Sequence, residues 1–156
     1  MENKIKPNLF IVGAAKAGTS ALHAILSEHP NIFMSPVKEP NYFSSDLLVD
    51  NFNSEQKKKF KNEKIQFLNN GAVRPCHQLY VRNKTDYLRL FKDADSKVKY
   101  CGEASVSYLF SKIAAQKIKE FNPVSKIIII LRNPVERAFS HFLMDLKIGR
   151  SKSALV

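Results

Sequence analysis

The segment IVGAAKAGTSAL, residues 11–22, has the glycine spacing of a phosphate-binding loop. In the loop of nucleoside triphosphatases, G-x-x-x-x-G-K-[ST], a lysine directly follows the second glycine. Here Gly13 and Gly18 keep that spacing, but Thr19 follows Gly18 and the lysine is Lys16, inside the loop. The segment therefore predicts a strand, an anion-binding loop and a helix, with a cation placed differently from that of a triphosphatase.

Length and charge restrict the kind of protein. The chain has 156 residues, with 25 lysines and arginines against 14 aspartates and glutamates, and a formal net charge of +11. We expect one domain over residues 1–156, with anionic partners favoured by the charge. Cys76 and Cys101 are too few for a disulfide framework or a zinc site. The longest apolar run, residues 127–131, is too short to span a membrane, so a cytoplasmic protein is the simplest expectation.

Short apolar runs alternate with amphipathic segments along the chain. The clearest predicted buried strands are residues 8–13 (NLFIVG) and 125–131 (SKIIIIL),. Helix 19–29 should place Leu22, Ile25 and Leu26 on one face. The other predicted elements are strands at 31–35 and 98–103 and helices at 54–68, 85–94 (capped by Thr85), 108–121 (Leu109, Ile113 and Ile118 on one face) and 133–148 (capped by Asn133). This alternation predicts an α/β protein: a P-loop-type, three-layer fold with a central parallel sheet flanked by helices.

Polar segments follow three of the predicted strands. They are GAAKAGTS, GEAS and RNP, which begin at Gly13, Gly102 and Arg132. Ligands of parallel α/β sheets bind beyond the carboxyl ends of the strands. We therefore expect the three segments to meet at one edge of the sheet and to form a single site there.

The residues at this edge indicate transfer of a group from a phosphate. A magnesium-dependent triphosphatase needs an acidic residue at a strand end to hold its metal, whereas the strand KIIIIL is followed by Arg132. A lysine inside the loop would stabilise negative charge on a departing phosphate oxygen. The acceptor must lose a proton, and Glu39, in the loop VKEPNYF, is the candidate base. No metal is needed for this charge balance.

Two other classes of function stay open at this point. A P-loop nucleotide kinase or triphosphatase with an unusual lysine position would bind ATP with magnesium. A non-catalytic anion-binding or nucleic-acid-binding protein would be insensitive to Glu39→Gln and would bind duplex DNA with a strong salt dependence. Of these possible partners, nucleic acid is the less favoured.

Three motifs in order resemble those of sulfotransferases that use 3′-phosphoadenosine 5′-phosphosulfate (PAPS). They are FIVGAAKAGTSALHAILSEHPNIFMSPVKEPNYF, GEASVSYL and ILRNPVERAFSHF, with an unmatched stretch around residues 47–84. The similarity is greatest to the branch of heparan sulfate sulfotransferases and their bacterial relatives. It implies PAPS as cosubstrate, no metal, and sulfonate transfer to a hydroxyl, with an amine as the alternative, of a glycan or other acceptor.

The resemblance also implies roles for individual residues. Glu39 corresponds to the family's proposed catalytic base, and Lys16 would contact the bridging oxygen and the sulfonate. Arg132 and Ser140 would bind the 3′-phosphate, for which the planar fork of an arginine is suited. The 5′-phosphate would be held by the backbone of Ala17, Gly18 and Ala21 and by the side chains of Thr19 and Ser20.

The sequence departs from the family pattern in places. Ala104 stands where many members have lysine, Val106 where proline is common, and Asn41 where several relatives have histidine. Family domains normally continue well past the helix of the 3′-phosphate site. The resemblance therefore implies that this chain is the N-terminal part of a family domain whose C-terminal portion is missing. It also implies apolar surface left uncovered, which would favour association.

Overall fold

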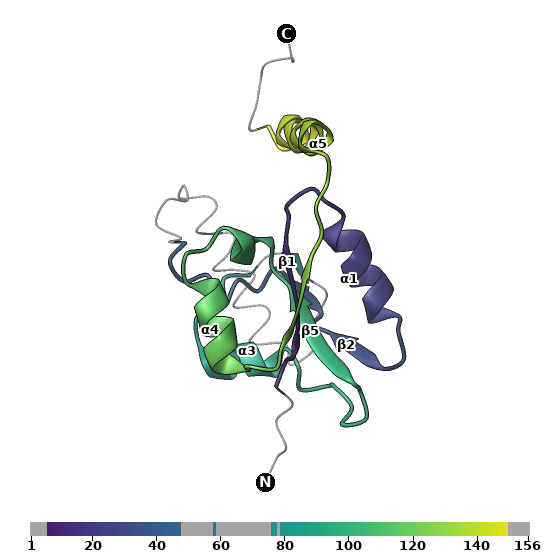
Figure 1. The fold of residues 1–156 in the computed structure, drawn as a ribbon, viewed down its shortest axis with the longest axis vertical. Helices are drawn as coiled ribbons and strands as arrows, with labels where there is room; N and C mark the ends of the chain where they lie inside the picture. The colour runs from purple at the N-terminus through teal and green to yellow at the C-terminus, as the bar shows by residue number, and fades with distance from the viewer. Residues whose placement is uncertain (1–5, 48–57, 59–75, 78, 150–156) are drawn as a thin grey trace.

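The computed structural model describes residues 6–47, 58, 76–77 and 79–149 (Figure 1). The helix predicted at 54–68 lies outside this part of the chain except for Lys58, which is helical. In chain order the elements are β1 (Leu9–Gly13), α1 (Thr19–Ser27), β2 (Ile32–Met34), β3 (Val37–Lys38), β4 (Cys76–His77), α3 (Lys84–Arg89), β5 (Tyr100–Ala104), the 3₁₀ helix η2 (Val106–Leu109), α4 (Ala114–Phe121), β6 (Lys126–Ile129) and α5 (Pro134–Lys147).

The main sheet has four parallel strands in the order β2-β5-β1-β6. In the register, Ile11 of β1 lies beside Ala104 of β5, and Gly13 lies beside Ile129 of β6. Figure 1 shows α1 on one side of this sheet and α3 and α4 on the other. The strands β3 and β4 form a separate parallel pair. The predicted parallel sheet flanked by helices is thus confirmed.

Strand β1 contributes to the core on both faces of the sheet. Successive side chains of a strand point to opposite faces. Phe10 and Val12 accordingly pack with residues of α3 and α4, whereas Leu9 and Ile11 pack near Leu22 of α1. A continuous apolar run is what a strand covered on both faces requires, and all residues of β1 are buried.

Strand β6 is not the buried strand that SKIIIIL predicts. Among the described residues it pairs only with β1, at the edge of the sheet. Ile127 is 47% exposed and Ile129 is 52% exposed. An apolar cavity of about 340 Å³ separates these two side chains from α4. The prediction failed on one face only: Ile128 and Ile130 pack against the cluster that contains Leu9 and Ile11, whereas the face with Ile127 and Ile129 is exposed in the described chain.

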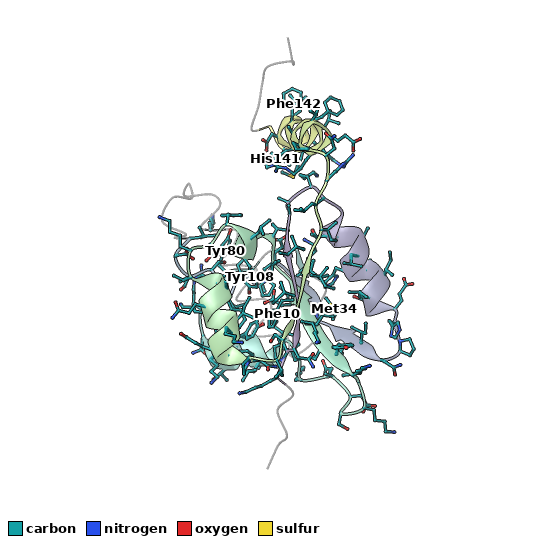
Figure 2. All side chains as sticks on the ribbon, in the orientation of Figure 1. Phe10, Met34, Tyr80, Tyr108, His141 and Phe142 are labelled. Atoms are coloured by element: carbon teal, nitrogen blue, oxygen red, sulfur yellow. The ribbon has the colours of Figure 1, made fainter. Side chains whose placement is uncertain are left out.

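Helix α5 stands away from the rest of the fold. It has no buried residue, and Figure 1 shows it beyond the end of the sheet. Figure 2 shows His141 and Phe142 on this helix, far from Tyr108, which lies between the sheet and α4. Its start is as predicted, because the Asn133 side chain accepts hydrogen bonds from the backbone N–H groups of Val135 and Glu136. A local signal therefore defined this helix without any help from packing.

Three helix predictions need correction. The segment predicted as one helix, 108–121, is η2 followed by α4, because the hydroxyl of Ser111 accepts the N–H of Ala114 at 3.0 Å and starts a new helix there. The cap of α3 is Asn83 and not Thr85. Of the three residues predicted on one face of α1, Leu22 and Leu26 are partly buried against the sheet, whereas Ile25 is 65% exposed.

Candidate active site

The loop between β1 and α1 needs its two glycines for different reasons. Gly13 has φ 151°, and a Cβ there would lie 2.8 Å from the side chain of Leu109. Gly18 has φ 100° and open space around it, so the backbone conformation alone favours glycine,. Lys16 between them also has a left-handed φ of 65°. The loop is thus held in a shape that few sequences adopt easily.

Helix α1 begins at Thr19 without a side-chain cap on Gly18. The N–H groups of a first helical turn have no partner within the helix, and they carry its positive dipole end. Thr19 is 4% exposed, whereas Ser20 and Ala21 are exposed. The structure therefore leaves Ser20 as the accessible hydroxyl of the pair and directs the first-turn amides toward the loop.

Arg132 follows the strand that lies beside this loop. The N–H of Ile130 donates to the carbonyl of Gly13 at 2.8 Å, and the N–H of Ala14 donates back to Ile130 at 2.7 Å. Arg132 is two residues beyond Ile130, and Lys16 is two residues beyond Ala14. The two cations therefore leave neighbouring strands at the same edge of the sheet.

Within the described residues, the side chain of Arg132 has one ion-pair partner. Its Nε donates to Glu136 on α5 at 3.0 Å, and both side chains are exposed. A surface pair of this kind contributes little and is easily exchanged for another anion. Ser140 lies further along the same helix and is half-buried. Both residues predicted for the second phosphate are thus on the β6–α5 segment.

Glu39 is anchored at the end of β5, the strand on the other side of β1. Its N–H donates to the carbonyl of Ala104 at 2.7 Å, and its Oε2 accepts the N–H of Val106 at 3.3 Å. Its Oε1 accepts a bond from Nζ of Lys38 at 2.5 Å. The residue is 7% exposed and has φ 65°. The carboxylate is therefore held in place, near the surface, at the edge from which Lys16 emerges.

Asn41 organises the turn that carries Glu39. Its Nδ2 donates to the carbonyls of Glu39, at 2.6 Å, and Leu79, at 3.1 Å. Its Oδ1 accepts the hydroxyl of Ser107, and its carbonyl accepts the guanidinium of Arg82 at 2.7 Å. Every polar group of this buried side chain is thus used within the protein. At the position where the resemblance implies a histidine in several relatives, this chain thus has a structural residue.

Sequence reasoning gave no role to Glu103, which is completely buried at the end of β5. Its Oε1 accepts the hydroxyls of Tyr87, at 3.0 Å, and Tyr108, at 2.6 Å. Its Oε2 accepts the hydroxyl of Ser105 at 2.6 Å. Burial raises the pKa of Glu103 to about 7, against the opposing effect of these three donors. An acidic residue inside the predicted strand VKYCGE was the available signal, because buried carboxylates are rare unless they have partners.

The described part of the chain bears on metal binding and on membrane spans. Within it, no group of three or more histidine, cysteine, aspartate or glutamate side chains could hold a metal ion. No helix there is long and apolar enough to cross a membrane.

The parallel sheet, with a glycine loop after β1 and a cation after each of β1 and β6, defines a P-loop-type α/β protein with two cationic residues at one edge of its sheet. The chain belongs to the sulfotransferase family, which matches residues 7–154. This confirms the family expected from the three motifs.

Similar proteins agree with that assignment. The bifunctional heparan sulfate N-deacetylase/N-sulfotransferase 1 of Xenopus laevis is 29% identical over 137 residues, which is 87% of this chain and 12% of that protein. The protein of the same name from Caenorhabditis elegans is 31% identical over 140 residues, or 89% of this chain and 13% of the relative. A sulfotransferase of Alicyclobacillus acidocaldarius has a similar crystal structure, with a TM-score of 0.77, 36% identity and coverage of 96% of this chain and 54% of its own. The chain thus spans a small part of the curated relatives and about half of the solved one.

Proposed function

We propose that this chain transfers a sulfonate group from PAPS to an acceptor hydroxyl or amine on a glycan. Sulfotransferases of this family generally take the sulfonate from PAPS. The observation that carries the proposal is the order of three groups along one sheet edge. Glu39 is tied to the end of β5, the Lys16 loop follows β1, and Arg132 follows β6, on three neighbouring strands.

The donor would lie across the ends of β1 and β6. In this proposal the amides of Ala17, Gly18 and Ala21 and the accessible hydroxyl of Ser20 bind the 5′-phosphate, whereas the predicted contact of Thr19 requires its buried hydroxyl to become accessible. The first-turn amides of a helix are suited to that group, and the N–H of Ala17, which donates to the carbonyl of Ala14 at 3.2 Å, would exchange that bond for one to the phosphate. Arg132 leaves Glu136 to bind the 3′-phosphate, with Ser140 as a further donor. The site would then bind both phosphorylated ends of one nucleotide, with a cationic residue for each anionic end of the donor.

The transfer step uses two residues, one beside the leaving oxygen and one that accepts the proton. The acceptor oxygen or nitrogen forms a bond to sulfur while the bond from sulfur to the bridging phosphate oxygen breaks. The departing electron pair stays on that oxygen, where the ammonium of Lys16 stabilises it. The acceptor proton passes to the carboxylate of Glu39. Adenosine 3′,5′-bisphosphate then leaves, and the proton on Glu39 returns to water.

A glycan acceptor is supported by the names of the relatives, which act on heparan sulfate. Those names specify N-sulfotransfer, so an amine joins the hydroxyl as a candidate. The net charge of +11 also suits a polyanionic chain,. The family match argues against a nucleotide kinase, whereas a non-catalytic anion-binding protein is left as an outcome of the test.

A transfer assay with radiolabelled sulfonate tests the proposal. The acceptors are a heparan-type polysaccharide with free glucosamine amines and the same polysaccharide with every amine acetylated. Label on only the first acceptor would assign the amine, and label on both would assign hydroxyls. Lys16→Met should abolish transfer, while Lys97→Met, in the exposed turn before β5, should leave it unchanged. Binding of the bisphosphate without transfer to either polysaccharide would instead support a non-catalytic protein.

A further inference from the structure

We infer that Glu103 is a positioning residue that holds the segment 39–43, and with it the proposed base, through two hydroxyl groups. The inference rests on the proposed function, because it assumes that Glu39 takes the acceptor proton. Glu103 itself is completely buried, so it can reach neither donor nor acceptor.

The first connection runs through Ser105. The backbone N–H of Asn41 donates to Oγ of Ser105 at 3.1 Å. The same hydroxyl donates to Oε2 of Glu103 at 2.6 Å. Because the hydroxyl of Ser105 is held by Glu103, it in turn holds the N–H of Asn41 in place. Such chains of hydrogen bonds are strengthened in a low-dielectric interior.

The second connection runs through Tyr108 and ends two residues further along. The backbone N–H of Phe43 donates to the hydroxyl of Tyr108 at 3.3 Å, and that hydroxyl donates to Oε1 of Glu103 at 2.6 Å. Two backbone amides of the turn after Glu39 are thus fixed to one buried carboxylate. Tyr87 also donates to Oε1, at 3.0 Å, but no hydrogen bond in the described structure continues from its hydroxyl to the turn.

The turn needs such anchoring because its backbone is strained. Glu39 and Asn41 have φ values of 65° and 53°. A non-glycine residue in this left-handed region is strained and persists only where its surroundings enforce it. Loss of either connection should therefore let the turn relax toward ordinary φ values and move Glu39 away from the acceptor.

Protonation of Glu103 should weaken the anchor. An ionised carboxylate accepts all three hydroxyls, whereas a neutral acid must donate from one oxygen and so turns one hydroxyl away. The groups that face it are Tyr87 of α3, Tyr108 of η2, Ser105 and the carboxylate of Glu39. Lys38 is bound to Glu39 rather than to Glu103, and burial raises the pKa of the neighbouring Cys101 thiol to about 12, so that thiol stays neutral.

Amide hydrogen exchange measured by NMR tests the two connections without requiring turnover. Ser105→Ala should reduce the protection of the Asn41 amide about fivefold and leave that of Phe43 unchanged, which is the effect expected for loss of one hydrogen bond. Tyr108→Phe should do the reverse. Tyr87→Phe is the matched control, because it removes a bond to the same carboxylate oxygen but leaves both connections. If the amides of Asn41 and Phe43 kept their wild-type protection in all three variants, the inference would be overturned.

Kinetics then test the consequence for Glu39. Glu103→Gln presents an NH₂ group to at least one of the hydroxyls, so kcat should fall about 10- to 100-fold, as for a misplacement of about 1 Å. The Kd for adenosine 3′,5′-bisphosphate should change less than about twofold, because the donor site lies on other strands. The wild-type kcat should rise with pH through about 7, and this rise should be absent in the variant.

The two proposals can fail separately. A wild-type chain without sulfonate transfer, but with the crossed exchange pattern of Ser105→Ala and Tyr108→Phe, would reject the proposed function and keep the anchor. Normal transfer with a wild-type kcat and pH profile in Glu103→Gln would reject the positioning role and keep the function. The two hydroxyl variants also decide the question should Glu103→Gln not fold.

Discussion

The backbone N–H of Ile130 is bonded to the carbonyl of Gly13 at 2.8 Å. This bond fixes how the chain leaves the sheet at two distant points in the sequence. Two residues beyond Ile130 comes Arg132, and three residues beyond Gly13 comes Lys16. Because the strands are parallel, both side chains begin from the same edge. The proposed donor site is therefore a consequence of the pairing of β1 with β6.

Removing the carboxylate of the proposed base should affect chemistry and not binding. Glu39→Gln keeps the shape of the side chain but cannot accept a proton. We expect kcat for sulfonate transfer to fall about 10²- to 10⁴-fold, the usual range for a general base, with the Kd of the bisphosphate unchanged. Glu28→Gln, at the exposed end of α1, is the control. An unchanged rate in Glu39→Gln would remove this residue from the mechanism.

Gly18→Ala should weaken donor binding through the backbone. The residue has φ 100° with open space around it, so an added methyl group meets no atom but disfavours the loop conformation. We expect a cost of roughly 1–2 kcal/mol, seen as about 5- to 30-fold weaker binding of the bisphosphate in calorimetry. Gly149→Ala, also at positive φ and in open space, should show the same strain in thermal unfolding without affecting binding. Equal affinities in wild type and Gly18→Ala would show that the loop tolerates alanine.

The exposed face of β6 should cause self-association. Replacing Ile127 and Ile129 together by threonine keeps the β-branched shape and removes apolar surface from an exposed strand. Sedimentation velocity should show concentration-dependent association of the wild type and a monomer for the double variant. The free energy of unfolding should change little, by about 0.5 kcal/mol per site. Ile11→Thr, on the buried neighbour β1, should instead destabilise the fold by about 1–3 kcal/mol.

The titration of Glu103 should make the free energy of unfolding and the kcat for sulfonate transfer respond to pH in opposite directions. Its pKa rises from the ordinary 4.5 to about 7 in the fold, so the folded state holds this proton more tightly than the unfolded state. Stability from this group is complete below about pH 4.5 and is lost as the pH rises through about 7, by on the order of 3 kcal/mol. Urea unfolding at several pH values should show this decline in wild type and not in Glu103→Gln. A slope that persists in the variant would assign it to another group.

The sequence was sufficient where local patterns decide the structure. The buried run of β1, the glycine loop and the Asn133 cap depend on neighbours in the chain, and each is where it was predicted. Family membership followed from three such motifs, and the family match confirms it. The assigned contacts of Lys16 and Arg132 with a donor are still predictions.

The sequence was insufficient where partners come from far along the chain. The carboxylate of Glu103 accepts a hydrogen bond from the hydroxyl of Tyr87 of α3, and the side chain of Asn41 donates one to the carbonyl of Leu79. Neither pairing leaves a periodic signal in the sequence. The exposure of β6 was missed for a related reason. Its isoleucines indicate that the strand could be buried, but they do not indicate whether another segment of the described chain covers it.

Isothermal titration with adenosine 3′,5′-bisphosphate, in the presence of a metal chelator, tests the central claim most directly. The claim is that cations from β1 and β6 bind the two phosphorylated ends of one nucleotide. We predict metal-independent binding that weakens about 10- to 100-fold in Arg132→Ala, as expected for loss of a charge-assisted bond to phosphate. Adenosine 5′-phosphate, which lacks the 3′-phosphate, should bind wild type and Arg132→Ala equally. Equal affinity of the bisphosphate for both proteins, or binding that requires magnesium, would contradict the account.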